Sequence, residues 1–186
     1  MLLDPATFAF TKAVEAGYPT FRREFHALRR DDFELWPDTG AYHGEWFAFP
    51  LFLQSHPAEI DKRFARNQGL CPESNAILRS IPGVVSAGFS WMESGCHIYS
   101  HVDAKPENLL RAHLGLEVPS GALMRVGKDQ HTWTEGRCLV FDGIVDHETA
   151  NTAPTRRVVL LVDALLDHHE FGCLKAWRAE HGITAV

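Results

Sequence analysis

The sequence is poor in cysteine and in long apolar runs, and each scarcity excludes a class of protein. Its four cysteines form no CxxC pair, so the spacing indicates neither a zinc knuckle nor a dense disulfide framework. No run of about 18 apolar residues occurs, and the N-terminus shows no charged start followed by an apolar core. We therefore expect reduced thiols in a cytoplasmic protein that is not inserted in a membrane.

Basic residues are outnumbered by acidic ones. There are 18 Lys and Arg against 24 Asp and Glu, which gives a formal net charge of −6. A nucleic-acid surface normally gathers lysine and arginine onto one face, so no nucleic-acid partner is expected. The chain is 45% hydrophobic and shows no internal repeat or low-complexity segment. Its 186 residues therefore predict a single domain over residues 1–186.

Helix signals dominate the first part of the chain. Four helices are predicted from their start signals: after Asp4-Pro5 and ending at Gly17, from Pro19, after Pro57, and from Pro72 to Arg79. The apolar residues that recur at helical spacing and should face a core are Phe21, Phe25, Leu28, Ile60 and Phe64. We expect residues 1–82 to be a mainly helical buttress and residues 167–186 to form a C-terminal tail or helix.

Residues 83–166 contain short extended runs that are divided by turn residues. The candidate strands are Val84–Met92, His97–Asp103, Leu109–Val118, Ala122–Val126, Arg137–Phe141 and Arg157–Asp163. This pattern predicts a mainly β fold with flanking helices: a double-stranded β-helix of the jelly-roll, cupin-like type behind a helical N-terminal region. Such a barrel can hold a metal inside its mouth.

A possible metal site lies in the second candidate strand. His101 and Asp103 are two residues apart, so on a regular strand their side chains share one face. A second histidine, such as that in Asp146-His147-Glu148, would complete a set of two imidazoles and one carboxylate. Such a triad occupies one face of an octahedral ion and leaves three positions open, as an Fe(II) oxygenase requires.

Strand alternation predicts which polar side chains meet. The sets that share a face are His97, Tyr99, His101 and Asp103; Arg111, His113 and Gly115; and Arg157, Val159 and Leu161. If each face lines the barrel, the polar members converge on a single cavity, where unpaired charges are costly. A bound metal and a dianionic ligand would supply the missing partners. Arg156 has the opposite parity and is interpreted as a surface charge.

Several sequence blocks occur in an order that is typical of one family. Between Cys71 and Asp163 they are Phe89-Ser90-Trp91-Met92, Gly95-Cys96-His97, His101, Arg111-Ala112-His113-Leu114-Gly115-Leu116-Glu117-Val118-Pro119, Trp133-Thr134-Glu135-Gly136, Phe141-Asp142, His147-Glu148, and Arg157 ahead of Val162-Asp163. In these blocks the sequence resembles the catalytic domain of the aspartyl/asparaginyl β-hydroxylase family. The members are double-stranded β-helix dioxygenases that use Fe(II), 2-oxoglutarate and O2.

The resemblance implies a role for each candidate residue. His101 and His147 would be the iron imidazoles, and Asp103 stands where a third ligand would lie. For 2-oxoglutarate the implied residues are Ser90 and Arg157 at the distal carboxylate, and Arg111 with His113 at the carboxylate near the metal. The planar fork of an arginine matches a carboxylate and stays charged, which suits this role.

Two positions depart from the family pattern. The animal members resemble this chain but carry glycine where Asp103 stands, and a full facial triad favours hydroxylation over halogenation. Members that act on aspartyl side chains have an arginine two residues before the position of Arg111, whereas this chain has Leu109. The apolar residue weakens the expectation of an Asp or Asn substrate and suits a less charged target.

Three hypotheses on function follow from the sequence. The leading one is an Fe(II)/2-oxoglutarate hydroxylase that oxidises an unactivated C–H bond of an amino acid, a short peptide or a related small metabolite. The second is a cupin-like hydrolase or isomerase that depends on zinc or another metal, because His-x-Asp with a distant His also binds zinc. The third is a non-catalytic binding module, against which Asp103 and Arg157 argue. The oligomeric state stays open.

Overall fold

The computed structural model describes residues 1–53 and 64–184. The strands are β1 (Glu34–Leu35), β2 (Tyr42–His43), β3 (Trp46–Leu53), β4 (Val84–Met92), β5 (His97–His101), β6 (Leu109–Glu117), β7 (Ala122–Val126), β8 (Asp129–His131), β9 (Cys138–Phe141), β10 (His147–Asn151) and β11 (Arg157–Leu165). The helices are η1 (Pro5–Thr7), α1 (Ala9–Ala16), α2 (Tyr18–Ala27), η2 (Arg30–Asp32), α4 (Ala65–Leu70), α5 (Pro72–Ser80) and α6 (His168–Glu180).

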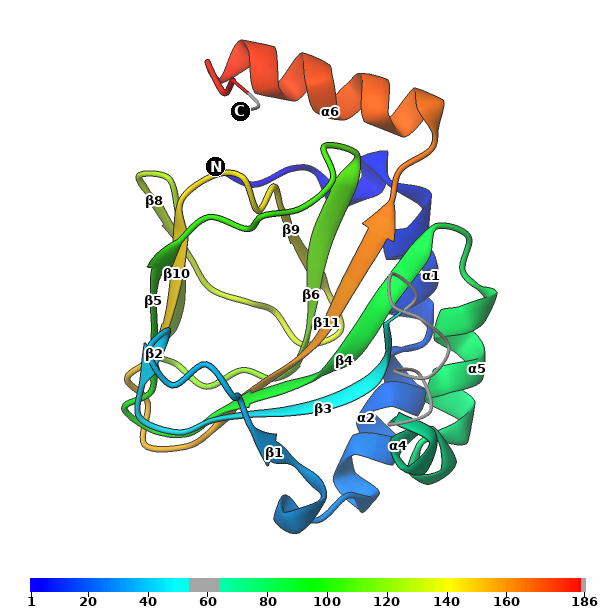
Figure 1. The fold of residues 1–186 in the computed structure, drawn as a ribbon, viewed down its shortest axis with the longest axis vertical. Coiled ribbons are helices and arrows are strands. Elements are labelled where there is room, and N and C mark those ends of the chain that lie inside the picture. Colours follow the sequence, from blue (N-terminus) through cyan, green and yellow to red (C-terminus); the bar gives the residue numbers. More distant parts are fainter. Residues whose placement is uncertain (54–63, 185–186) are drawn as a thin grey trace.

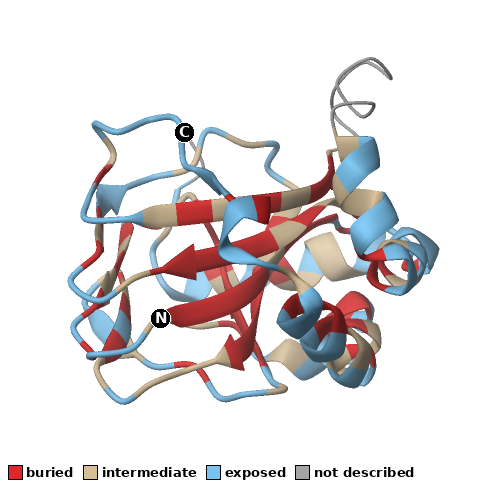
Figure 2. Ribbon diagram, turned by 90° about the horizontal axis from the view of Figure 1, so that it is seen from below, coloured by how far each residue is buried: buried red, intermediate tan, exposed pale blue. Residues whose placement is uncertain are grey.

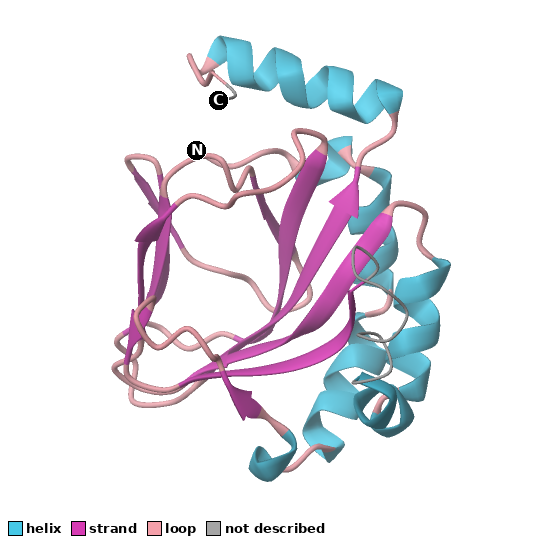
Figure 3. Ribbon diagram, in the orientation of Figure 1, coloured by secondary structure: helices cyan, strands magenta, loops and turns pink. Residues whose placement is uncertain are grey.

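Two antiparallel sheets face each other across a barrel (Figure 1). The larger sheet has six strands in the order β1-β3-β4-β11-β6-β9, and the smaller has five in the order β2-β5-β10-β7-β8. Helices α1, α2 and α5 cover the outside of the larger sheet, and α6 lies across one end of the barrel (Figure 3). The fold is a double-stranded β-helix of the jelly-roll, cupin-like type, which confirms the predicted fold class.

The hydrophobic core lies between the larger sheet and the helices. On β11, Val158, Leu160 and Val162 are fully buried on the helix side, where they join a cluster that includes Phe21 and Phe25 of α2. Figure 2 shows these central strands buried beneath helices whose outer surfaces are exposed. Because alternate residues of a strand face opposite sides, the other face of the same strands looks into the barrel.

The helices begin largely where their start signals predicted. Asp4 caps η1 by accepting a hydrogen bond from the N–H of Ala6 at 2.9 Å, although a break at Phe8 separates η1 from α1. The buried carboxylate of Glu24 on α2 accepts hydrogen bonds from the first N–H groups of α5, a favourable place for a negative charge. The helix predicted after Pro57 falls mostly outside the described residues and stays a prediction; beyond that gap the described chain forms α4 from Ala65.

The expectation that residues 1–82 are mainly helical is corrected in part. Strand β3 pairs with β4, where Ala48 stands opposite Ser90, and the two-residue β1 pairs with β3. Burial alternates along most of β3, with Phe47 and Phe49 buried toward the helices. The N-terminal region therefore extends the larger sheet as well as supporting it.

None of the helices in residues 1–53 and 64–184 combines the length and hydropathy that spanning a bilayer requires.

Candidate metal centre and co-substrate cavity

A cavity of about 970 Å³ lies between the two sheets. All seven residues that the sequence singled out line it: Ser90, His101, Asp103, Arg111, His113, His147 and Arg157. They come from β4, β5, the loop after β5, β6, β10 and β11. Strands that are distant in the sequence therefore bring the predicted polar groups to one place.

The potential metal ligands converge at the mouth of this cavity. Ligand atoms of His101, Asp103 and His147 all lie within 4.8 Å of one another. His101 Nε2 is 3.8 Å from Asp103 Oδ1, and the two imidazole rings have centroids 4.3 Å apart. Two imidazoles and a carboxylate at this spacing form a donor set that fits an octahedral Fe(II) ion with open positions.

A β-bulge directs His101 into the barrel. Strand register pairs Ile98 with Thr149 and His101 with His147, so two residues, Tyr99 and Ser100, stand opposite Glu148 alone. Such a bulge inserts one residue and reverses the strand parity beyond it. The prediction that His97 shares a face with His101 is therefore wrong: His97 contacts Glu148 at 3.0 Å on the outer face.

Backbone carbonyls hold the orientation of both imidazoles. His101 Nδ1 is 2.7 Å from the carbonyl oxygen of Tyr99, and His147 Nδ1 is 2.9 Å from that of Val145. Each carbonyl selects the tautomer that carries its proton on Nδ1, which leaves Nε2 with a lone pair for a metal. Burial also lowers the pKa of His147, which favours the neutral, metal-binding form.

Arg111 holds the carboxylate of Asp103 in place. Its guanidinium contacts Asp103 Oδ2 at 2.8 Å and binds both oxygens of Asp163, at 2.7 and 3.0 Å. Burial opposes the charge of Arg111, but the two carboxylates outweigh it and raise its pKa. The backbone N–H of Asp103 donates to the carbonyl of Gly143 at 2.7 Å, and a side chain at Gly143 would collide with the Asp103 carboxylate.

Arg157 is a buried cation without a carboxylate. Only 1% of the residue is exposed, and within residues 1–53 and 64–184 no acidic group lies within ion-pair distance of it. Its guanidinium contacts Ser90 Oγ at 3.5 Å and the Met92 sulfur, and it stacks 4.8 Å from the Trp133 ring centre. Burial lowers the pKa of Arg157 to about 10. Its neighbour Arg156 binds Glu117 on the other side of the sheet, as its parity predicted.

His113 is a second buried group that lacks a partner. Neither of its ring nitrogens has a hydrogen-bond partner among the described residues, although the side chain lies in the cavity wall. The ring stacks against Trp133 and contacts the edge of Phe141. Burial, reinforced by the nearby Arg157, lowers the pKa of His113 well below its usual value, so the imidazole is neutral. A neutral imidazole and a free guanidinium in one cavity can together bind an anionic ligand.

The structure also places residues that the sequence analysis missed or misjudged. Trp46 donates its indole N–H to Ser90 Oγ at 3.0 Å and thereby positions that hydroxyl. Asp163 is the main partner of Arg111. The run Trp46–Leu53 is apolar throughout, so no alternation of polar and apolar residues pointed to Trp46. Trp91 packs among core aromatics, and Leu109 is not part of the cavity lining.

The fold and the site define a class of protein: a double-stranded β-helix with a two-histidine, one-carboxylate cluster in its mouth. Residues 15–166 match the family described as aspartyl/asparaginyl beta-hydroxylase. The chain belongs to this family of hydroxylases.

Three known proteins illustrate the relationship. The chain is 34% identical over 172 residues to the ornithine lipid ester-linked acyl 2-hydroxylase of Rhizobium tropici, covering 86% of this chain and 58% of that protein. It is 31% identical over 130 residues to the human aspartyl/asparaginyl beta-hydroxylase, covering 64% of this chain but 16% of the human protein. A Pseudomonas putida prolyl-4-hydroxylase structure aligns with a TM-score of 0.48 at 18% identity, over 87% of this chain and 90% of that one.

Proposed function

We propose that this protein is an Fe(II)- and 2-oxoglutarate-dependent hydroxylase. His101, Asp103 and His147 would hold the iron, and Arg157 with Ser90 would bind the distal carboxylate of 2-oxoglutarate. The observation that carries the proposal is the buried Arg157 guanidinium, which has no acidic partner among the described residues and shares a cavity with the His-Asp-His cluster. A dianionic co-substrate would supply the charge that this cation lacks.

The side chains of this site would each perform a positioning task. The carbonyls of Tyr99 and Val145 present the histidine lone pairs to the ion, and Arg111 aims Asp103 at the same point. We therefore assign Arg111 to the support of the metal centre, because two carboxylates already occupy its guanidinium. Bound together, iron, 2-oxoglutarate and O2 supply the oxidant for an unactivated C–H bond.

The inner end of the cavity is suited to hold the co-substrate in one orientation. Arg157 and Ser90 lie on adjacent strands of the rigid larger sheet, and Trp46 fixes the Ser90 hydroxyl from the next strand. His113 carries one donor and one acceptor nitrogen, and we propose that it contacts the co-substrate from β6. Trp133 and Phe141 enclose this end with apolar surface and exclude water.

The outer part of the cavity supports a substrate with an apolar portion. The residues there include Leu35, Trp36, Pro37, Trp46, Ala48, Pro50, Phe52 and Leu53. Trp36 stacks on Trp46 with ring centres 4.5 Å apart, and 38% of Trp36 remains exposed. Because the relative from Rhizobium tropici is named as an acyl hydroxylase, we propose an acyl chain as the first substrate to test, ahead of an aspartyl side chain.

Anaerobic titration tests the proposed co-substrates. Wild-type protein with Fe(II) should develop a visible charge-transfer band when 2-oxoglutarate is added, whereas a zinc hydrolase or an inert binding module should not. His101→Ala and His147→Ala should each abolish the band and metal binding, because each leaves a single imidazole beside the Asp103 carboxylate. A normal band in either variant would contradict the assignment of the iron ligands.

Turnover distinguishes the substrates. The enzyme would be incubated with iron, ascorbate, 2-oxoglutarate and a matched panel of acyl esters and aspartyl peptides, with succinate release and a gain of one oxygen measured by mass spectrometry. Trp36→Ala should raise KM for acyl substrates and leave the charge-transfer band unchanged. Oxidation of the aspartyl peptides alone would refute the acyl preference and leave the co-substrate assignment intact.

A further inference from the structure

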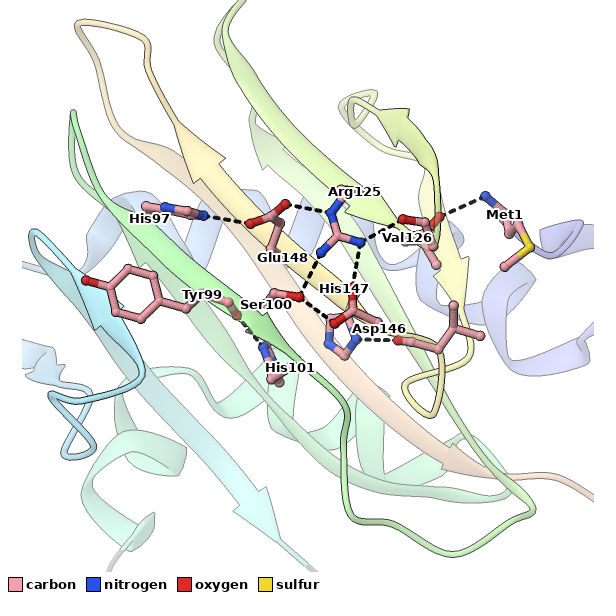
Figure 4. Close-up of polar contacts among 12 residues, drawn as sticks. Met1, His97, Tyr99, Ser100, His101, Arg125, Val126, Asp146, His147 and Glu148 are labelled. Atoms are coloured by element: carbon pink, nitrogen blue, oxygen red, sulfur yellow. Dashed lines mark hydrogen bonds and ion pairs between the residues drawn. The ribbon is translucent and has the colours of Figure 1, made fainter. Parts of the chain in front are cut away.

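A network of charged side chains lies on the outer face of the smaller sheet, directly behind the potential metal ligands (Figure 4). Arg125 of β7 is its centre, and 23% of that side chain is exposed. The guanidinium contacts Glu148 Oε1 at 2.6 Å through Nε, Asp146 Oδ1 at 2.6 Å through Nη1, and Ser100 Oγ at 2.8 Å through Nη2. It also donates to the carbonyl of Gly127 at 2.6 Å.

The partners of Arg125 are the sequence neighbours of the two histidines. Ser100 precedes His101 on β5, while Asp146 and Glu148 flank His147 on both sides. Ser100 Oγ also donates to Asp146 Oδ2, which joins the two segments a second time. One guanidinium therefore ties together the backbone segments that carry both imidazoles, from the face opposite the cavity.

The Arg125 contacts lie where the pairing of β5 with β10 is irregular, so they support the least regular part of this strand pair. Tyr99 and Ser100 form the bulge opposite Glu148, and this bulge is what turns His101 inward. A bulge leaves a residue outside the ladder and weakens local pairing. Arg125 bridges the bulge on one side and the start of β10 on the other, so it restrains the two places where the histidines could separate.

We propose that Arg125 is a positioning residue that holds His101 and His147 in register for a divalent metal. The inference rests on the proposed function, because it requires the histidines to be ligands. Each exposed ion pair taken singly contributes little to stability. The value of Arg125 lies in its rigid planar fork, which engages several groups at once and fixes their relative positions.

The anchoring of β7 does not depend on Arg125. The residues on either side of Arg125 in β7, Met124 and Val126, are fully buried on the inner face and pack in a cluster with Trp133 and Phe141. Loss of the guanidinium should therefore leave the sheet folded while loosening the histidines. Loss of groups that orient metal ligands typically weakens metal affinity by about 10–100-fold.

Cobalt titration of the metal-free protein tests this role without any assay of turnover. Co2+ binding to wild type, Arg125→Gln, Arg125→Lys and Arg137→Gln would be followed by visible absorption, and metal-free thermal unfolding by circular dichroism. Arg137 is the matched control, since its guanidinium pairs with Glu15 at 2.9 Å on the surface, and it is 73% exposed. Asp146→Asn is a second test variant, which keeps Arg125 but removes the negative charge that pairs with Arg125 and accepts the hydrogen bond from Ser100.

The expected result separates geometry from stability. Arg125→Gln should raise the Co2+ Kd by about 10–100-fold and shift the absorption bands, and Arg125→Lys should recover part of the affinity. Arg137→Gln should keep the wild-type Kd and bands, with a similar small change in Tm. A wild-type Kd and spectrum in both Arg125→Gln and Asp146→Asn would overturn the proposal, as would equal losses in Arg137→Gln.

His101→Ala distinguishes this proposal from the one on which it rests. If wild type binds Co2+ and His101→Ala does not, the metal centre stands, and the Arg125 variants judge the positioning role alone. If wild type binds no Co2+, the metal centre itself fails and the positioning role fails with it.

Discussion

Replacing Arg157 with methionine should change stability and co-substrate affinity in opposite directions. The guanidinium is buried among Ser90, Met92 and Trp133, and no described acidic group pairs with it. Methionine is similar in length but uncharged, so it can fill the space without the cost of burying a cation. A residue that is retained for folding alone would not be expected to show this behaviour.

The magnitude follows from the pKa of Arg157 and from its contacts. Burial lowers that pKa to about 10, and at about 1.4 kcal/mol for each pH unit of this lowering the cost is roughly 3 kcal/mol. The lost stacking on Trp133 and the lost contact with Ser90 offset part of this gain, so the metal-free variant should be about 1–2 kcal/mol more stable. Its Tm should rise by about 3–6 °C.

The effect on 2-oxoglutarate has the opposite sign. Hydrogen bonds from a charged donor contribute about 1.5–3 kcal/mol. The Kd for 2-oxoglutarate should therefore rise roughly 10–150-fold in Arg157→Met. Thermal unfolding of the metal-free protein and anaerobic titration of the Fe(II) charge-transfer band measure the two quantities separately.

Arg156→Met is the matched control for this experiment. Arg156 binds Glu117 through two nitrogens, at 2.6 and 2.9 Å, on the other side of the sheet, so its loss should lower Tm slightly and leave 2-oxoglutarate affinity unchanged. If Arg157→Met were less stable than wild type and bound 2-oxoglutarate normally, the interpretation of Arg157 as an anion anchor would be refuted.

Two further predictions concern the metal centre and the thiols. Asp103→Gly should retain two-histidine metal binding with a higher Co2+ Kd, measured by visible titration, and an unchanged Kd would remove Asp103 from the ligand set. For the cysteines, burial raises the pKa of Cys71 and Cys138 to about 12 and that of Cys96 to about 11, which keeps these thiols protonated. Only the partly exposed Cys173 should react rapidly with Ellman's reagent at pH 8 before unfolding, and rapid reaction of a second thiol would contradict the described burial.

Local signals predicted the larger sheet well. The run Val84–Met92 forms β4 with the predicted bounds, and β6 and β11 differ from their predicted runs by one and two residues. These runs are rich in apolar residues, and one face of each is buried under the helices. Strands β3 and β10 were not predicted. β3 is extended because it pairs with β4, and β10 is extended because it pairs with β7. These hydrogen bonds join distant parts of the chain, so no local sequence pattern reveals them.

The candidate site was predictable in its members but not in their relations. Residue type, order and family resemblance selected seven residues that the structure brings to one cavity, although they missed Asp163 in the same cavity wall. They did not reveal that Arg111 is already neutralised by Asp163 and Asp103 whereas Arg157 has no such partner. Both are arginines on inward faces. They differ in whether a neighbouring segment places a carboxylate beside the guanidinium, as Asp103 and Asp163 do for Arg111.

The sequence by itself determined which donor groups this protein carries. It also predicted which of them would share a face on a regular strand, because side-chain alternation follows from covalent geometry and repeats every two residues. The tertiary structure alone decided which way those groups point. A single inserted residue at Tyr99-Ser100 sends His97 outward and His101 inward, and that insertion exists only relative to the partner strand β10. Charge balance is decided in the same way, since ion pairs join residues that the chain separates by dozens of positions.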